Sequence, residues 1–300
     1  MNQKLKTILK RIIPSALIIR PSDILLKVKI NRVKTTFNRS ATKPEFLEQQ
    51  ALFDLQKLYP PRTSYKYSED SLLERGEERV EKLSKLITDK SINKYLELAC
   101  WDGMVSYVLK QNGKETTAVD YRDIGFDIRA KDAGVNLLQM DAANLKFEDN
   151  SFDAVISYDA FEHFANPDKV LSEALRVVRK NGYVFLEFGP LYFSALGLHI
   201  YRDITVPYCQ FLFTKEVMDD FLVNEGKPKV DYTHCNGWTL IQFREMFKKY
   251  SQHFETIIYN EIPNYQFIDL IEKHPRCFKS KTDNFENLTI SSITVLLQKK

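Results

Sequence analysis

The sequence predicts an α/β fold in which a mostly parallel sheet is covered by helices on both faces. Three observations support this prediction. Short apolar segments typical of buried strands alternate with helical segments over residues 94–188, and parallel strands need such crossovers. Seven of the ten glycines lie between residues 103 and 197, where the connecting turns are expected. A chain of 300 residues with 44% apolar side chains can bury one large core.

Helices are expected before the first strand. Over residues 4–13, apolar side chains recur at helical spacing among basic residues until Pro14 ends the pattern. A second apolar and basic stretch, 24–33, follows Pro21, which suits the first turn of another helix. Two further helices are expected at residues 44–59 and 69–88, with a break between them at 59–62.

The strands and later helices follow from the same patterns. Strands are expected at residues 94–100, 116–121, 136–141, 152–158, 183–188, 254–261 and 292–297. The clearest helix spans 167–180, with proline in its first turn and Asn181-Gly182 as its stop, and another helix is expected at 239–250. An aromatic-rich segment, 190–238, interrupts the alternation of strands and helices, which predicts an insertion.

Charge and composition exclude several classes of protein. The chain carries 43 basic and 40 acidic residues, but ten basic residues and one acidic residue lie within 1–39. The remainder is mildly acidic, which argues against a nucleic-acid partner. The four cysteines show no paired spacing and are expected to be reduced thiols of a cytoplasmic protein. No apolar stretch near the start approaches the ~20 residues of a membrane span.

Carboxylates mark the carboxyl ends of the first three predicted strands, where open α/β sheets bind ligands. Glu97 lies in the first strand, Asp120 at the end of the second and Asp141 after the third. A ligand with a ribose diol, an amino group and an ammonium gives each acid a hydrogen-bond donor. The first turn offers Trp101 and Asp102 instead of a glycine-rich phosphate cradle, which argues against NAD.

The order of these motifs carries a family resemblance. The segments LELACWDGMVS, TAVDYRD, LLQMDAANLKFEDNSFDAVISYDAFEHF and ALRVVRKNGYVFLEF resemble the class I S-adenosylmethionine-dependent methyltransferases, in particular the small-molecule branch called type 11. The resemblance covers about a third of the chain closely. It implies a Rossmann-like, doubly wound, mostly parallel seven-stranded sheet, with N-terminal helices and an inserted lid segment. It also implies S-adenosyl-L-methionine as the cofactor.

The resemblance also implies roles for particular residues. Residues 97–103 match the loop around the methionine part of the cofactor, Asp120 the ribose-binding acid and Asp141 the acid that contacts the adenine amino group. The implied cofactor-binding residues are Glu97, Ala99, Trp101, Gly103, Asp120, Tyr121, Asp141, Ala142 and Tyr158. Ala99 and Trp101 depart from the glycines of the family pattern. We expect the backbone at Trp101 to adopt negative φ and the indole to pack on the cofactor; the alternative is weakened binding.

Two histidines are candidate catalytic bases, because methylation of an oxygen or nitrogen releases a proton. His163 follows the fourth strand, where the resemblance also allows a structural role, and His199 lies in the insertion. The aromatic content of the insertion suits an acceptor site but equally suits simple packing. His199, Cys209, His234 and Cys235 lack the short paired spacing of zinc ligands, so no metal site is expected.

These observations predict an S-adenosylmethionine-dependent methyltransferase that acts on a small molecule or a saccharide, as in surface-polysaccharide synthesis. The alternatives are a non-catalytic docking protein of the same fold and an NAD-dependent or nucleotide-sugar-dependent α/β enzyme. A basic arm, 1–43, is expected to precede a methyltransferase domain, 44–300, with 190–238 as the acceptor-binding insertion. The arm, over 1–39, is expected to contact an anionic membrane, to pack on protein or to remain a solvated tail.

Overall fold

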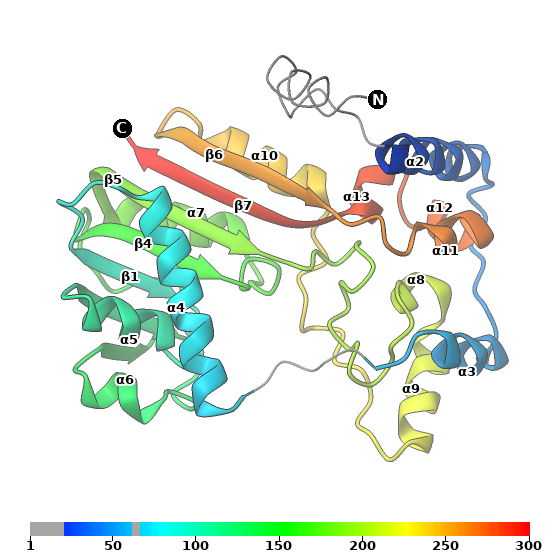
Figure 1. Cartoon of the computed structure of the whole chain (residues 1–300), viewed down its shortest axis with the longest axis horizontal. Coiled ribbons are helices and arrows are strands. Elements are labelled where there is room, and N and C mark those ends of the chain that lie inside the picture. The colour runs from blue at the N-terminus through cyan, green and yellow to red at the C-terminus, as the bar shows by residue number, and fades with distance from the viewer. Residues whose placement is uncertain (1–20, 62–66) are drawn as a thin grey trace, which may run out of the picture. The chain divides into compact units, whose positions relative to one another are not determined.

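The computed structural model describes residues 21–61 and 67–300 (Figure 1). The amphipathic helix expected at residues 4–13 lies outside the described residues. Two compact units are defined by internal contacts: one combines the chain up to Phe46 with Tyr265–Phe285, and the other combines Leu47–Asn264 with Glu286–Lys300. The sequence did not indicate that the segment Tyr265–Phe285 joins the N-terminal unit. The division into 1–43 and 44–300 therefore stays a prediction.

A seven-stranded sheet forms the larger unit, in the order β3-β2-β1-β4-β5-β7-β6. Its strands are β1 (Lys94–Leu98), β2 (Glu115–Asp120), β3 (Asn136–Gln139), β4 (Phe152–Tyr158), β5 (Val178–Phe188), β6 (Phe254–Pro263) and β7 (Ile290–Lys299). β1 to β5 are parallel, and β7 runs antiparallel between β5 and β6. The predicted fold class is confirmed. The strand order reverses between β1 and β4, and open α/β sheets generally bind ligands at the carboxyl ends of strands at such a point.

Helices cover both faces of this sheet, as its apolar strands require. On one face, α4 (Glu69–Leu86) and α5 (Met104–Gln111) pack on alternate residues of β1 and β4, and α6 (Ile128–Asp132) lies beside them. On the other face, α7 (Pro167–Val177) and α10 (Leu240–Tyr250) bury their apolar sides. Figure 1 shows α4 crossing the face of the sheet toward the ends of β1 and β4.

The predicted end of the helix at residues 167–180 is wrong. α7 ends at Val177, and Val178 already begins β5 by pairing with Phe152 of β4. Asn181, with φ of 61°, and Gly182 form an irregularity within β5, where the register against β4 shifts. Gly182 is required there, since a Cβ atom would lie 2.6 Å from the carbonyl oxygen of Asp153. The Asn-Gly pair therefore forms an irregularity within a strand and does not end a helix.

The insertion at residues 190–238 contains two helices, α8 (Cys209–Leu212) and α9 (Lys215–Asn224). α3 (Gln49–Leu58), which begins later than the predicted residue 44, contacts α9. Tyr208 is fully buried, and its hydroxyl donates to the carbonyl of Leu288. These contacts make the insertion a packed part of the larger unit.

In the smaller unit, α2 (Pro21–Arg39) packs on α11 (Ile268–Lys273) and α12 (Pro275–Lys279). The predicted helix after Pro21 is confirmed. Val33 and Phe37 are fully buried, and Lys29 pairs with Asp269 at 2.7 Å. A short helix, α13 (Phe285–Thr289), leads into β7.

Within residues 21–61 and 67–300, no helix combines the length and the apolar character that a membrane crossing requires.

Candidate functional site

The loop between β1 and α5 keeps a left-handed backbone without the usual glycines. The φ angles of Ala99, Trp101 and Gly103 are 53°, 50° and 78°. The expected negative φ at Trp101 is therefore wrong. Hydrogen bonds fix the loop: Cys100 N donates to Val119 O at 3.1 Å, and Trp101 N donates to Asp120 Oδ2 at 3.0 Å. They outweigh a backbone strain of roughly 1–2 kcal/mol at each non-glycine position.

The indole of Trp101 stands partly in solvent, with 48% of the residue exposed. The guanidinium carbon of Arg122 lies 3.9 Å from the indole centroid, a cation–π contact. Arg122 also pairs with Asp120, at 3.3 Å between Nε and Oδ1. Trp101, Arg122 and Asp120 therefore form one cluster at the carboxyl ends of β1 and β2. Packing of the indole on a cofactor stays a prediction.

Asp120 is buried, and its two oxygens receive different donors. Oδ2 accepts from Trp101 N, and Oδ1 accepts from the backbone and side chain of Arg122. A carboxylate has about four acceptor positions, and three are used, so Asp120 retains capacity for one further donor, such as a hydroxyl. Because Asp120 also fixes the loop after β1, the sequence-predicted ribose-binding acid has a structural role as well.

Glu97 faces α5 from within β1. Its Oε2 accepts from the backbone N and the hydroxyl of Ser106, at 3.0 and 2.6 Å. Burial raises the pKa of Glu97 to about 7; the hydrogen bond from Ser106 opposes the shift, and the charge of Asp102 adds to it. Glu97 thus fastens strand to helix at the start of the predicted site.

Replacing Glu97 with glutamine is expected to remove a pH dependence of stability. In the unfolded chain a glutamate ionises near ~4.3, but in the folded chain Glu97 stays protonated up to about pH 7. The unfolded state releases its proton first, so this group lowers the free energy of unfolding as pH rises between these values. Urea unfolding at pH 4.5 and 8 should show Glu97→Gln gaining about 3 kcal/mol relative to wild type. Parallel pH profiles for the two proteins would contradict this account.

Two arginines that the sequence analysis did not single out reach the same strand ends from α4. Arg75 donates to Asp102 Oδ2 at 2.5 Å, while Asp102 Oδ1 accepts from Met104 N at 2.9 Å. One turn later, Arg79 pairs with Asp159 just after β4. Their four-residue spacing on a helix was the available signal, because it places both on one face. α4 therefore contributes positive charge beside the acids of β1 and β4.

The remaining predicted cofactor residues differ in their surroundings. Asp141 is exposed, and its Oδ1 accepts from Ala143 N at 2.8 Å, whereas Ala142 is buried. Tyr121 is 72% exposed beside Asp120. Tyr158 is buried under α4, and its hydroxyl donates to the carbonyl of Arg79 at 3.1 Å. The cofactor roles of all four stay predictions, and the contacts of Tyr158 serve packing.

A cavity of about 420 Å³ opens beyond the ends of β4 and β5. Polar side chains from several elements line it together with apolar ones: Lys82, Asp159, Glu187, Phe188, Ser194, Ile262, Ser292 and Thr294. Lys82 of α4 pairs with Glu187 at the end of β5. The hydroxyl of Ser194 is buried without a hydrogen-bond partner among the described residues. The cavity therefore offers charged groups and hydroxyls beside an apolar wall.

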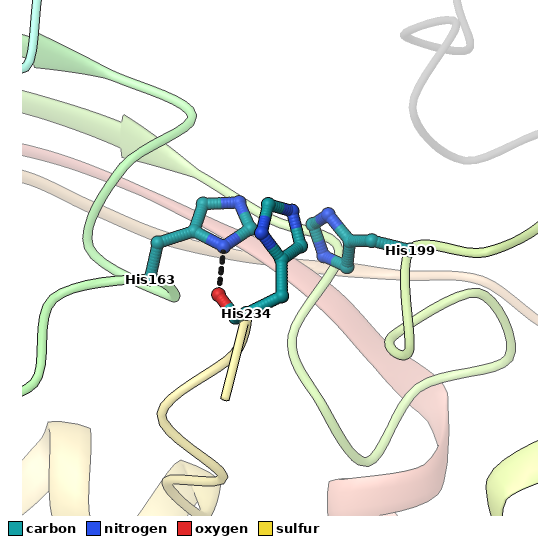
Figure 2. Close-up of side chains that lie close together, drawn as sticks. All are labelled: His163, His199 and His234. Atoms are coloured by element: carbon teal, nitrogen blue, oxygen red, sulfur yellow. Dashed lines mark hydrogen bonds between the residues drawn. The ribbon is translucent and has the colours of Figure 1, made fainter. Parts of the chain in front are cut away.

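The two candidate catalytic histidines do not line this cavity but meet a third histidine (Figure 2). One ligand atom from each of His163, His199 and His234 lies within 4.8 Å of the others. His163 Nδ1 donates to the carbonyl of His234 at 2.6 Å, and His199 Nε2 donates to that of Pro190 at 2.8 Å. Burial lowers the pKa of His163, and it lowers the pKa of His199 to about 4 with help from neighbouring His163. A catalytic role for either stays a prediction.

Comparison with known proteins finds methyltransferases. Residues 96–186 match the family described as "Methyltransferase domain". The chain is 34% identical over 125 residues to a demethylmenaquinone methyltransferase of Thermus thermophilus, covering 39% of this chain and 56% of the relative. It is 34% identical over 100 residues to a probable phthiotriol/phenolphthiotriol dimycocerosates methyltransferase of Mycobacterium ulcerans, covering 32% and 39%. The chain thus spans about half the length of the curated relatives that it matches.

Among solved structures, the PH0226 protein of Pyrococcus horikoshii superposes with a TM-score of 0.49 and 20% identity, covering 82% of this chain and 99% of that one. The similarity in fold is loose at this score. The sheet order defines the class of the protein as an open α/β fold, and the predicted ligand site lies over β1, β2 and β4. The match over residues 96–186 and the curated relatives show that this segment is similar to methyltransferase domains, in line with the resemblance to class I S-adenosylmethionine-dependent methyltransferases.

Proposed function

We propose that this chain transfers a methyl group from S-adenosylmethionine to a small-molecule acceptor. One observation carries the proposal: Glu97, Asp120 and Asp141 stand at the ends of β1, β2 and β3 around a left-handed loop. Carboxylates in this arrangement suit a ligand that is rich in hydrogen-bond donors. The charges of Asp120 and Asp141 oppose a pyrophosphate, because like charges repel at short range, and this favours a sulfonium nucleoside over NAD.

The residues present fit S-adenosylmethionine group by group. Asp120 keeps one acceptor position for a ribose hydroxyl, and Asp141 is exposed after β3, where it can accept from the adenine amino group. Arg75 brings a guanidinium to the loop after β1, which suits the carboxylate of the methionine part. The cofactor supplies an electrophilic methyl group on its sulfur. The chain's residues bind and align it, which is the main requirement of an in-line displacement.

The cavity beyond β4 and β5 is the proposed acceptor site, because β4 lies directly beside β1, whose following loop belongs to the proposed cofactor site. A hydroxyl acceptor loses a proton on methylation, and Asp159 and Glu187 are the carboxylates on the cavity wall that are placed to receive it. Hydroxyls of Ser194, Ser292 and Thr294 beside Phe188 suit an acceptor with several hydroxyls and one apolar face, such as a saccharide.

Product formation tests this choice of acceptor. The purified chain is incubated with isotopically labelled S-adenosylmethionine and either nucleotide sugars or demethylmenaquinone, and transfer of label is measured by mass spectrometry. Methylation of a sugar hydroxyl is the expected result. Label on the quinone alone would exclude the saccharide but retain methyl transfer. No label on either, with cofactor bound, would favour the non-catalytic alternative.

We also propose that α2 contacts an anionic membrane surface. Ile24, Leu25 and Val28 are 51%, 70% and 59% exposed in the first half of the helix, whereas Val33 and Phe37 in its second half are buried. Residues 1–39 add ten basic side chains, which complement anionic headgroups. The two halves of α2 thus divide between packing within the smaller unit and a free apolar surface.

Replacing Leu25 and Val28 together with serine is expected to weaken binding to phosphatidylserine vesicles by roughly 10-fold, because both side chains lose apolar burial. Co-sedimentation measures the binding, and Val223→Ser, an exposed apolar site outside the basic segment, is the matched control. Equal sedimentation of wild type and the double variant would contradict membrane contact through α2. Deleting residues 1–39 is a poorer test, since it removes the buried Val33 and Phe37 as well.

A further inference from the structure

Three loops of the larger unit meet at His163, His199 and His234 (Figure 2). His163 lies just after β4, His199 lies early in the insertion, and His234 lies between α9 and α10. More than 30 residues separate each histidine from the next, so the meeting point depends entirely on the tertiary fold. The chain has only five histidines, and three of them gather here.

The hydrogen bonds of the cluster leave ring nitrogens free for a ligand. His163 gives its Nδ1 proton to the carbonyl of His234, so Nε2 carries the lone pair. His199 gives its Nε2 proton to the carbonyl of Pro190, so Nδ1 carries the lone pair. A ring nitrogen that donates to a backbone carbonyl while the other stays bare is the usual arrangement of a metal-binding histidine.

The surrounding backbone already holds the three loops in place. Asn236 Nδ2 donates to the carbonyls of Phe161 and Phe164, and Asn236 N donates to that of Glu162. Cys235 Sγ donates to the carbonyl of Gly197 at 3.3 Å. The ligand atoms within 4.8 Å of one another therefore need only small side-chain movements to reach the ~3.3 Å separation that follows from tetrahedral bonds of ~2.0 Å.

A buried carboxylate beside the cluster gives a second, independent observation. Glu162 is 1% exposed, its Oε1 accepts from Gly189 N and lies 3.8 Å from His163 Nε2. Its Oε2 is buried without a hydrogen-bond partner among the described residues. A buried carboxylate that lacks a partner is costly, and a nearby cation offsets that cost.

We propose that His163, His199 and His234 bind one divalent transition-metal ion of the zinc class, which fastens the insertion to the loop after β4. Three imidazoles fill three positions of a tetrahedral ion and leave one open. Gly189 and Pro190, which contact Glu162 and His199, also line the cavity beyond β5. The ion would therefore stiffen one wall of that cavity.

Cobalt titration of the untagged, chelator-treated full chain tests the site, because Co²⁺ bound by histidines has a visible absorption spectrum and takes zinc sites. Wild type is expected to bind one ion per chain, with displacement by Zn²⁺ and a raised Tm. His234→Ala, at an exposed position, is expected to weaken binding at least ~10-fold. His253→Ala, an exposed histidine outside the cluster, is the matched control.

His199→Asn provides a second variant that preserves the loop, because His199 has a φ of 62° and asparagine tolerates that conformation. It is expected to lose Co²⁺ as His234→Ala does, with an unchanged circular dichroism spectrum. Co²⁺ binding that is equal in wild type and both variants, or absent in wild type, would overturn the proposal. Neither result depends on methyl transfer, so the site and the proposed function stand or fall separately.

Discussion

Asp120→Asn is expected to weaken S-adenosylhomocysteine binding by roughly 10–100-fold while the fold is retained. The asparagine oxygen still accepts from Trp101 N, so the loop after β1 keeps that anchor, although the amide nitrogen cannot accept from Arg122 as Oδ1 does. The negative charge is lost, however, and a hydrogen bond to a charged acceptor contributes about 1.5–3 kcal/mol. Isothermal titration calorimetry measures the affinity, and circular dichroism reports the fold.

Asp123→Asn is the matched control for this substitution. It removes the same charge three residues farther along the chain, at an exposed position. A long-range electrostatic effect alone would lower the affinity for S-adenosylhomocysteine similarly in both variants. Direct binding by Asp120 would lower it in Asp120→Asn only. An unchanged affinity in Asp120→Asn would remove Asp120 from the cofactor site.

Gly197→Ala is expected to destabilise the larger unit by about 3 kcal/mol or more. A Cβ atom at residue 197 would lie 2.2 Å from Leu191 O and 2.3 Å from Tyr192 O, far closer than a Cβ atom approaches a non-bonded oxygen. These are backbone atoms, so no side chain can move aside, and the start of the insertion must rearrange. The free energy of unfolding in urea measures the effect.

Gly226→Ala separates this steric effect from ordinary glycine strain. Gly226 has a φ of 70°, but its Cβ position is open, so only about 1 kcal/mol is expected there. Similar destabilisation by the two alanines would contradict a steric clash between a side chain at residue 197 and the backbone of residues 191 and 192.

Most of the fold could be predicted because buried parallel strands have a strong local signal. β4 lies at 152–158, as predicted, since a mostly apolar segment lies between the polar Ser151 and Asp159. The start of β5 could not be predicted, because Val178 is a strand residue only through its partner Phe152. Asn181-Gly182 is a sequence that commonly ends a helix. In this fold it lies within β5 instead, because β5 pairs with β4 on both sides of it.

The strand-end acids could be predicted since topology alone brings Glu97, Asp120 and Asp141 to one edge of the sheet. Arg75 and Arg79 could not, because the position of α4 over the sheet depends on packing that the sequence does not reveal. The backbone at Trp101 was also missed. Residue preference favours negative φ there, but the hydrogen bond to Asp120 imposes the left-handed conformation.

The histidine cluster illustrates the same limit for metal sites. Sequence reasoning searches for closely spaced ligands, and His199, Cys209, His234 and Cys235 fail that criterion. The structure brings together a different set, in which His163 replaces both cysteines. Cys209 and Cys235 are both buried, and Cys235 Sγ donates a hydrogen bond to the carbonyl of Gly197.

Calorimetric titration of the purified chain with S-adenosylhomocysteine, with NAD as the comparison ligand, tests the central claim most directly. The arrangement of Glu97, Asp120 and Asp141 predicts saturable binding of S-adenosylhomocysteine at one site per chain and no binding of NAD. Binding of NAD instead, or of neither ligand, would contradict the assignment of this site to S-adenosylmethionine.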